Sequence, residues 1–263
     1  MQVLLPPSEG KAASAAGAPL ALDSLSLPGL SAARERVLTA LVELCTGDQD
    51  TAAAVLGLSP GLRGELARNA ALRTAAALPA GQLYTGVLYD SLGLATLDDA
   101  ARARAEASLL VFSGLWGAVR IGDRIPPYRC SGGVRLPDLG ALGGYWRGPM
   151  ARVMPEVATG LVLDLRSSAY AALWKPSGEV AGRTATVRVL HERVVGGVTK
   201  RSVVSHFNKA TKGRLLRDLL EDGAQPASPA ELVDLLRELK YTVEATPAAA
   251  GRPWALDVVV AEL

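Results

Sequence analysis

Six short motifs constrain this chain most, because each ends an apolar run with Lys, Arg, Ser or Tyr beside Gly or Pro. An ending of this kind presents side chains and backbone N–H groups to an anionic partner. The motifs are spread along the whole chain, so one site requires a fold that gathers them. They are Leu4–Lys11, Tyr84–Gly86, Ser113–Gly117, Pro127–Arg129, Asp164–Ser168 and Ser205–Gly213.

The apolar periodicity predicts a mixed α/β fold in which short strands alternate with helices. Gly196-Gly197 separates two β-branched stretches and predicts a hairpin turn. We expect a mixed or mainly antiparallel sheet in a single domain, residues 1–263, with a helical subdomain inserted at about residues 31–76. Strands are expected at Val3–Leu5, Ser108–Phe112, Leu161–Leu165, Thr184–Leu190, Val198–Val204, Tyr241–Glu244 and Leu256–Val260. Helices are expected at Ser31–Cys45, Thr51–Leu56, Leu62–Ala70, Leu97–Ala107, Ala169–Trp174, His206–Leu220 and Pro229–Leu239.

The composition is that of a globular protein, with 49% hydrophobic and 21% charged residues. A net charge of +2 does not itself indicate nucleic acid, so any electrostatic argument must come from local clusters. Met1–Leu5 is too short for the apolar core of a signal segment, and a cytoplasmic location with no membrane association is expected. Cys45 and Cys130 are then expected to be reduced, and two His with two Cys make a zinc site unexpected. We expect no metal and no cofactor.

Two short predicted helices flank the turn Gly57-Leu58-Ser59-Pro60-Gly61 and form a candidate helix-hairpin-helix element. In such an element Gly57, Ser59 and Gly61 let backbone N–H groups approach a phosphate, and the following helix adds its positive end. The alternative is an ordinary helical hairpin in an Ala-rich subdomain.

The segment from Lys200 to Arg217 carries six cations and no acid. Cations on the first turns of a helix oppose its dipole, and a bound phosphate would compensate for them. At helical spacing His206 and Lys209 share one side, while Asn208 and Lys212 are four residues apart. The alternative is a solvated helix face.

The segment from Gly114 to Arg135 carries four arginines against the single acid Asp123. Arginine suits phosphate or carboxylate, and the interleaved Trp116 and Tyr128 offer faces for stacking. Arg120 and Arg129 are the candidate anion ligands. The alternative makes the two aromatics core residues and pairs Asp123 with a neighbouring arginine.

The first motif places Glu9 and Lys11 after a strand, without the glycine spacing of a Walker loop. Glu9 is interpreted as a salt-bridge partner of Lys11 or as a general base. Ser113 and Ser167 end strands, where nucleophiles often lie, but the chain has no Gly-x-Ser-x-Gly elbow that would support a serine hydrolase.

Taken together and in this order, the motifs resemble the YaaA family of bacterial peroxide-stress proteins, from the first strand to about Glu221. The resemblance implies an α/β domain of unusual topology, a positively charged cleft, a helix-hairpin-helix, binding of double-stranded DNA and protection of DNA when peroxide meets iron. One departure is the loop Pro6–Lys11, which is longer than the Ser-Pro-Ala-Lys loop of the best-known branch and carries an extra carboxylate.

Two functions remain open. The first is a monomeric, sequence-nonspecific DNA-binding protein of the oxidative-stress response. The second is an enzyme acting on a small anionic metabolite (a nucleotide, phosphate or carboxylate) in the same cleft, with Glu9, Lys11 or Lys209 moving protons. The candidate binding residues are Lys11, Ser113, Trp116, Arg120, Tyr128, Arg129, Ser167, His206, Asn208, Lys209 and Lys212.

Overall fold

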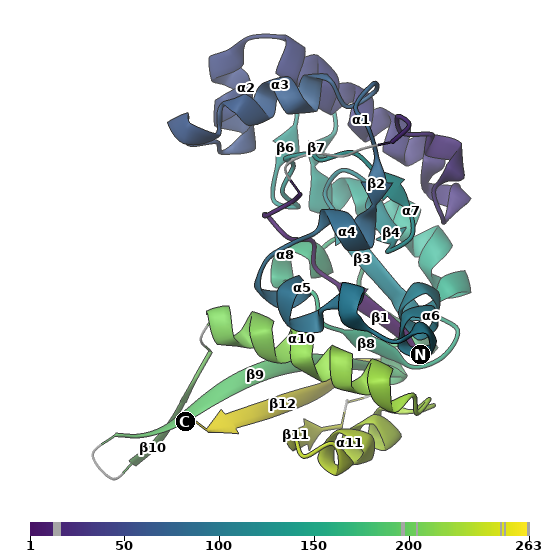
Figure 1. Cartoon of the computed structure of the whole chain (residues 1–263), viewed down its shortest axis with the longest axis vertical. Helices are drawn as coiled ribbons and strands as arrows, with labels where there is room; N and C mark the ends of the chain where they lie inside the picture. Colours follow the sequence, from purple (N-terminus) through teal and green to yellow (C-terminus); the bar gives the residue numbers. More distant parts are fainter. Residues whose placement is uncertain (13–16, 196–197, 204, 248, 250, 262–263) are drawn as a thin grey trace.

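An eight-stranded mixed sheet organises the computed structural model, which describes all residues except 13–16, 196–197, 204, 248, 250 and 262–263 (Figure 1). The mixed α/β class predicted from the sequence is confirmed. The strands are β1 (Gln2–Leu5), β2 (Leu78–Pro79), β3 (Leu109–Ser113), β4 (Gly117–Arg120), β5 (Arg124–Ile125), β6 (Arg135–Leu136), β7 (Gly140–Ala141), β8 (Val162–Asp164), β9 (Thr184–Val195), β10 (Val198–Ser202), β11 (Thr242–Thr246) and β12 (Trp254–Ala261). The helices are α1 (Ser31–Thr46), α2 (Gln49–Leu56), α3 (Gly64–Ala70), α4 (Ala80–Leu83), α5 (Val87–Leu92), α6 (Asp99–Ser108), α7 (Leu142–Val157), α8 (Ser168–Ala171), α9 (Gly178–Gly182), α10 (Ser205–Asp222) and α11 (Pro229–Glu238).

The expected mixed sheet is confirmed, and because its centre is parallel the mainly antiparallel alternative is excluded. The strand order is β11-β12-β9-β8-β1-β3-β4, and β10 pairs with β9. Every pairing from β3 through β1, β8 and β9 to β12 is parallel, while β4, β10 and β11 are antiparallel additions. Strands such as β1 and β3 are apolar runs because a parallel sheet is covered on both faces.

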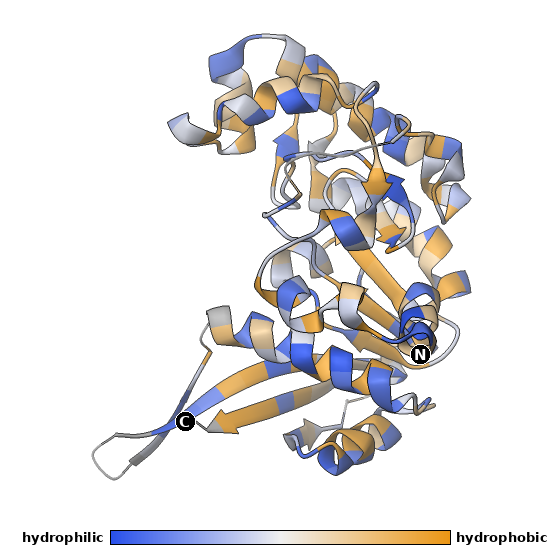
Figure 2. Cartoon of the chain, in the orientation of Figure 1, coloured by the Kyte–Doolittle hydropathy of each residue, from blue (hydrophilic) through white to orange (hydrophobic). Residues whose placement is uncertain are grey.

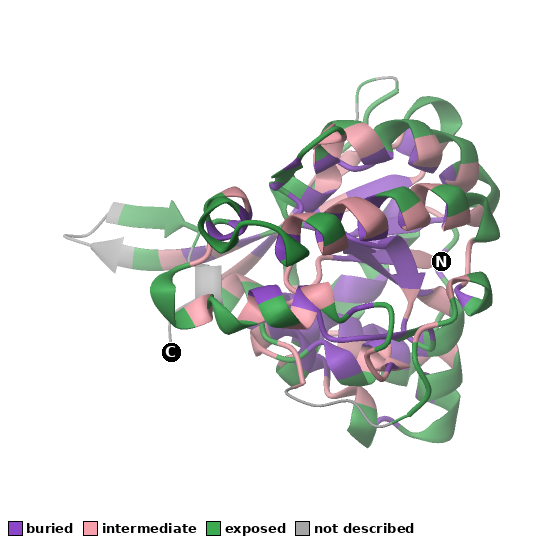
Figure 3. Cartoon of the chain, turned by 90° about the horizontal axis from the view of Figure 1, so that it is seen from above, coloured by how far each residue is buried: buried purple, intermediate pink, exposed green. Residues whose placement is uncertain are grey.

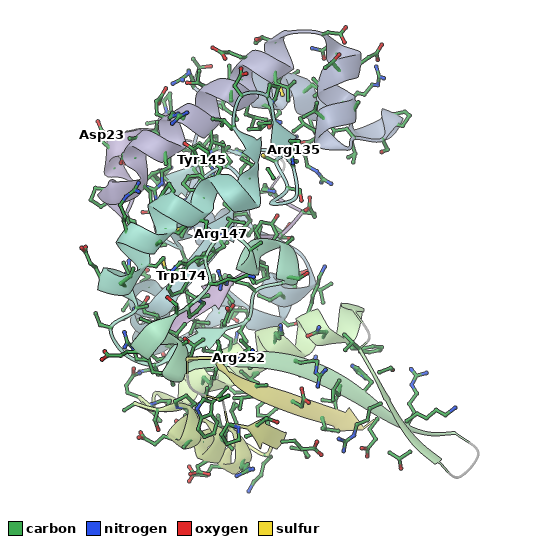
Figure 4. The ribbon with its side chains drawn as sticks, turned by 180° about the vertical axis from the view of Figure 1, so that it is seen from behind. Asp23, Arg135, Tyr145, Arg147, Trp174 and Arg252 are labelled. Carbon is green, nitrogen blue, oxygen red and sulfur yellow. The ribbon has the colours of Figure 1, made fainter. Side chains whose placement is uncertain are left out.

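Helices cover both faces of this sheet. The group α5, α6 and α10 lies on the face turned to the viewer in Figure 1, and α7 covers the opposite face in Figure 4, where its Tyr145 and Arg147 are labelled. The strands between them are strongly apolar in Figure 2, and Val3, Leu110 and Val162 are fully buried. Burial of these side chains is the main stabilising contribution to the fold.

Helix α10 packs closely on α5 because position 213 is a glycine. A methyl group built on Gly213 would press on the Leu88 carbonyl oxygen and would lie 2.7 Å from Cβ of Ser91 and 3.1 Å from the Leu92 nitrogen. The absence of a side chain therefore sets the distance between the two helices, and with it the position of the first turns of α10.

The pair α2–α3 is joined to α1 at one end of the molecule (Figure 1). Asp48 caps α2 by accepting a hydrogen bond from the Thr51 N–H, and Gly57 ends the helix in the left-handed conformation. Arg34 anchors α1 to the sheet, donating to the carbonyl oxygens of Trp116 at 3.1 Å and Ala118 at 2.7 Å. The division into one domain with an inserted helical subdomain stays a prediction.

Other outcomes follow local sequence signals. The Ser228 cap of α11 is present, with its hydroxyl accepting from the Glu231 N–H. Helix α7 was not predicted, because Pro149 and Pro155 lie inside it and proline normally interrupts a helix. The predicted turn Gly196-Gly197 lies outside the described residues, but β9 and β10 do pair antiparallel, and they project from the body (Figure 3). No helix in the described part of the chain is both long and apolar enough to cross a membrane.

Candidate functional site at the carboxyl edge of the parallel strands

The candidate site lies where the carboxyl ends of β8, β1 and β3 meet. The chain passes from β1 to β3 on one side, and later returns to place β8 on the other side of β1. This arrangement makes β1 the switch point of the sheet, and ligands of open α/β sheets bind in the crevice outside such a point. The loop that leaves β1 at this edge contains Glu9 and Lys11.

Lys11 is held between tyrosine rings. Its Nζ donates to the Ser8 carbonyl oxygen at 2.9 Å and lies 4.4 Å from the ring centre of Tyr128 and 5.7 Å from that of Tyr84. A backbone bridge between Lys11 and Tyr84 fixes the loop beside α4. The amine is therefore positioned by both its backbone and its surroundings.

The surroundings lower the pKa of the Lys11 amine to about 8. Burial is the largest cause, because it disfavours the charged form, and the nearby Arg129 guanidinium acts in the same direction. Glu9 and Glu65 oppose the shift by attracting the ammonium. A substantial fraction of this amine is consequently neutral near physiological pH.

Beneath Lys11, three hydroxyl groups form a buried chain. The Ser113 Oγ lies 2.6 Å from the Tyr128 hydroxyl, which lies 2.9 Å from the Tyr84 hydroxyl. Ser113 Oγ already accepts from the N–H groups of Leu115 and Trp116, so its own proton is available to Tyr128. Burial raises the pKa of both tyrosines, so they stay neutral hydrogen-bonding groups.

Arg129 is held at this edge by two different contacts. Its side chain forms an ion pair with Glu9, with Nη2 and Oε2 3.1 Å apart. Its backbone N–H donates to Oδ1 of Asn69 at 2.9 Å, while Nδ2 of Asn69 donates to its carbonyl oxygen at 2.8 Å. Because Asn69 belongs to α3, this clamp ties the helix pair to the loop that carries Arg129. Glu9 pairs with Arg129 and not with Lys11, which corrects the expected Glu9–Lys11 salt bridge.

A second cluster lies beside the first, at the end of β8. Asp164 and Arg166 form a two-pronged ion pair at 2.8 and 2.6 Å, and the Arg166 side chain is fully buried. Lys212 of α10 donates to the intervening Leu165 carbonyl oxygen at 3.2 Å. Burial lowers the pKa of Lys212 to about 8, and Asp164 opposes the shift. Tyr170 lies between the clusters, since its carbonyl oxygen accepts from Arg166 and its hydroxyl accepts from the Gly132 N–H.

The structure brings together part of the predicted site. Lys11, Ser113, Tyr128 and Arg129 lie at one edge, with Trp116 against Tyr128 in an edge-to-face contact at 6.0 Å. Ser113, Trp116 and Tyr128 are buried, so they support the edge and do not form its surface.

Arg120 does not belong to this group, which corrects the sequence-based assignment. Strand β4 runs antiparallel, and Arg120 pairs with Leu110 near the start of β3. Its guanidinium donates to the Ala107 carbonyl oxygen at the end of α6. Asp123 accepts from the Arg120 backbone N–H and from Ser26, so the expected pairing with an arginine side chain is replaced by these contacts.

The remaining candidates lie around the second cluster. Ser167 is exposed just after β8, and Lys209 is exposed on α10. Asn208 is half-buried, and its Oδ1 is buried without a hydrogen-bond partner among the described residues. Lys212 is 8% exposed, so it does not offer the surface charge that the sequence suggested. The side chain of His206 lies outside the described residues.

Four residues of the two clusters were missed by sequence reasoning as site residues: Asn69, Tyr84, Asp164 and Arg166. Three of them stand inside predicted motifs, Tyr84 in Tyr84–Gly86 and both Asp164 and Arg166 in Asp164–Ser168, which is a usable signal. Asn69 gave no signal, because its role depends on a loop 60 residues away. Tyr84 also lines a cavity of about 570 Å³, together with Thr85, Tyr89 and residues of α6.

The turn between α2 and α3 is open. Neither Gly57 nor Gly61 has any atom within 4 Å of the place where a Cβ would lie, and both are exposed. Gly61 belongs to the short 3₁₀ turn Pro60–Leu62 and is not in the left-handed region. Arg63 beside it pairs with Asp50, which offsets its charge.

Among the described residues, no group of three or more His, Cys, Asp or Glu is arranged to hold a metal ion.

Comparison with known proteins gives matches over nearly the whole chain. Residues 1–246 match the family described as "Peroxide stress protein YaaA", a span that includes all six motifs. A UPF0246 protein of Streptomyces coelicolor is 68% identical over 265 aligned residues, covering 100% of both chains. A UPF0246 protein of Corynebacterium efficiens is 42% identical over 99% of this chain and 100% of its own. A UPF0246 protein of Salinispora tropica is 34% identical over 63% of this chain and 61% of its own.

Proposed function

This chain belongs to the YaaA family of peroxide stress proteins, and we propose that it acts in that response by binding double-stranded DNA without sequence preference. The observation that carries the proposal is the Asn69 clamp. It joins α3, which follows the open Gly57–Gly61 turn, to the loop that carries Arg129. Glu65 of α3 is also close enough to raise the pKa of Lys11. An open glycine turn and a cationic edge are thus linked through α3, and each could contact a phosphate of the same backbone.

The phosphate contacts in this proposal come from the turn and from exposed cations. Backbone N–H groups near Gly57 and Gly61 approach one phosphate, and the start of α3 contributes the positive end of its dipole only weakly, since α3 is short. Lys209 supplies an exposed charge on α10, whereas Lys212 is committed to the Leu165 carbonyl oxygen. Binding of this kind is salt-dependent and largely independent of sequence.

We expect Gly61→Val to weaken DNA binding while the melting temperature stays near that of the wild type. Valine fits the backbone at position 61, and its side chain points into open space that a phosphate would otherwise occupy. Gly182→Val is the matched control, because Gly182 is equally open but lies by the opposite, amino edge of β8 and β9. Gel-shift titrations at several salt concentrations measure the DNA affinity of each variant. For Lys209→Ala, the slope of the logarithm of affinity against the logarithm of salt concentration should be smaller by about 1, because one cation is lost. Equal DNA affinity for wild type, Gly61→Val and Lys209→Ala would overturn the proposed interface.

We also propose a second candidate function, an enzyme acting on a small anionic metabolite at the carboxyl edge. One specific observation favours it: a lysine amine and an arginine lie together at the switch point of the sheet, with neutral tyrosines beneath them. Residues with perturbed pKa values in such a place are typical of catalytic sites.

A small carboxylate such as glyoxylate should therefore bind at this edge, and Arg129→Gln should weaken the binding at least about tenfold, since a charge-assisted hydrogen bond contributes about 1.5–3 kcal/mol. Chemical-shift titration of the amides of Ser8–Lys11 measures it. Arg63→Gln, at an exposed ion pair distant from Lys11 in sequence, is the control. Shifts that are absent, or equal in the two variants, would contradict the small-anion site.

A further inference from the structure

We propose that the Lys11 amine forms an imine with a small anionic aldehyde or ketone, which makes it a nucleophile and not only an ion-pairing group. This inference rests on the small-anion function proposed for the same edge. It does not require the DNA-binding proposal to be correct, because that proposal rests on the α2–α3 turn.

The choice of amino acid at position 11 is the first argument. The chain has 22 arginines and only six lysines. Four of the lysines, Lys175, Lys200, Lys209 and Lys240, are exposed, while Lys11 and Lys212 lie in the two clusters at the carboxyl edge. An arginine would keep its charge in either place, whereas a lysine can lose its proton when it is desolvated. A chain that otherwise uses arginine thus keeps a titratable amine at its switch point.

The contacts of Lys11 favour nucleophilic chemistry. Within the described part of the chain, Nζ has one hydrogen bond, to the Ser8 carbonyl oxygen, which orients it and leaves the rest of the amine available. The faces of Tyr128 and Tyr84 shield it from water and can stabilise a cationic iminium by cation–π attraction. A lysine becomes nucleophilic when it is desolvated and when another cation lies nearby, and Arg129 is that cation.

Arg129 also indicates the class of substrate. Its side chain is 27% exposed and is paired with the side chain of Glu9, which is 56% exposed. A carboxylate or phosphate on the substrate can replace Glu9 on the guanidinium at little cost, because an exposed ion pair is weak. The substrate is therefore an anionic carbonyl compound, held by Arg129 through its anion and presented to Lys11 through its carbonyl carbon.

The covalent step needs no redox partner. The lone pair of the neutral amine forms a C–N bond to the carbonyl carbon, and the carbonyl oxygen takes a proton to give a carbinolamine. A second proton reaches that hydroxyl group, water leaves, and the C=N bond of the imine remains. The two protons are those that the amine nitrogen gives up, so one amine and one carbonyl yield one imine and one water.

Lys212 shares the lowered pKa but not this geometry. Its Nζ donates to Leu165, only 8% of the residue is exposed, and the Asp164 carboxylate favours its charged form. It therefore serves as an internal comparison for Lys11 in any labelling experiment.

The experiment is reductive trapping of the full-length protein with glyoxylate and cyanoborohydride, followed by peptide mapping. We expect label at Lys11 ahead of the four exposed lysines, with a rate that rises with pH, is half-maximal near pH 8 and levels off only above that pH, as the amine becomes fully neutral. Lys11→Arg and Lys11→Met should abolish that label, whereas Lys175→Arg, at an exposed lysine outside both clusters, should not change it. Arg129→Gln should slow labelling by glyoxylate about tenfold or more and labelling by neutral acetaldehyde much less, because both reagents lose the cation that lowers the pKa of Lys11 but only the anion also loses its binding partner.

Each outcome bears on a distinct claim. Label concentrated on Lys11 and lost in Lys11→Arg, with glyoxylate shifts still present in that variant, supports the imine. Label spread evenly over the exposed lysines, or concentrated on Lys212, overturns it. Arg129-dependent glyoxylate binding without any Lys11 label overturns the imine while the small-anion function stands. Absence of both binding and label removes both.

Discussion

Asp164→Asn is expected to lower the free energy of unfolding by about 3–5 kcal/mol, because it leaves the buried Arg166 guanidinium without its counter-charge. Asparagine has nearly the same shape as aspartate, so the loss is electrostatic and not steric. The Arg166 side chain is fully buried, and its guanidinium stacks 4.2 Å from the ring centre of Phe112, which gives it no route to water.

Urea denaturation of wild type and variant at pH 7 measures this effect. Asp50→Asn is the matched control, since it breaks an ion pair with Arg63 whose two side chains are 52% and 78% exposed. An exposed pair of this kind contributes less than about 1 kcal/mol. If the two variants lose similar amounts of stability, the Asp164–Arg166 pair is not the buried contact described. Loss of Asp164 also removes the charge that attracts Lys212, so the pKa of Lys212 should fall further.

Gly213→Ala is expected to be the second most damaging change, with a loss of roughly 3 kcal/mol. Alanine normally stabilises a helix relative to glycine by up to about 1 kcal/mol, so propensity alone predicts the opposite sign. The methyl group would press on backbone atoms of α5, which cannot rotate away as a side chain can. The helices must separate, and apolar contacts between them are lost.

Gly144→Ala in α7 is the control that separates the effect of helix packing from the effect of helix propensity. Gly144 is exposed, and no atom lies within 4 Å of its Cβ position. Thermal melts should show Gly144→Ala unchanged or slightly more stable and Gly213→Ala strongly less stable. A Gly213→Ala protein that melts like the wild type would show that α10 and α5 are not in close contact.

Local patterns in the sequence predicted most elements and part of the site. Strand ends such as Ser113 carry their polar group at the boundary of an apolar run, and this signal is independent of how strands are ordered. The direction of a strand is not local, however. Arg120 was assigned to the same site as Ser113 because it lies in the arginine-bearing segment that follows Ser113, yet the antiparallel β4 carries Arg120 back toward the opposite edge. The parallel order of the central strands depends on crossovers that no single segment encodes.

Contacts between residues that are far apart in the chain also could not be predicted from the sequence. Glu9 and Lys11 are close in the chain, but the nearest guanidinium in space is that of Arg129, 120 residues later. Similarly, Lys212 was counted with the surface charges of a basic helix, whereas the packing of α10 turns it toward the end of β8. A basic run does not distinguish a solvated lysine from one that the fold has taken out of water.

The amide clamp between Asn69 and Arg129 physically connects the helix pair with the carboxyl edge, which has a consequence for any ligands that these two parts bind. A ligand that orders α3 also orders the backbone of Arg129, and a ligand held by Arg129 restrains α3 in return. If one ligand changes the affinity for the second by some factor, the second changes the affinity for the first by the same factor, because linkage between binding free energies is reciprocal. If both proposed ligands bind, duplex at the turn and an anion at the edge would be two inputs to one equilibrium, and the occupancy of either could be read from the affinity of the other.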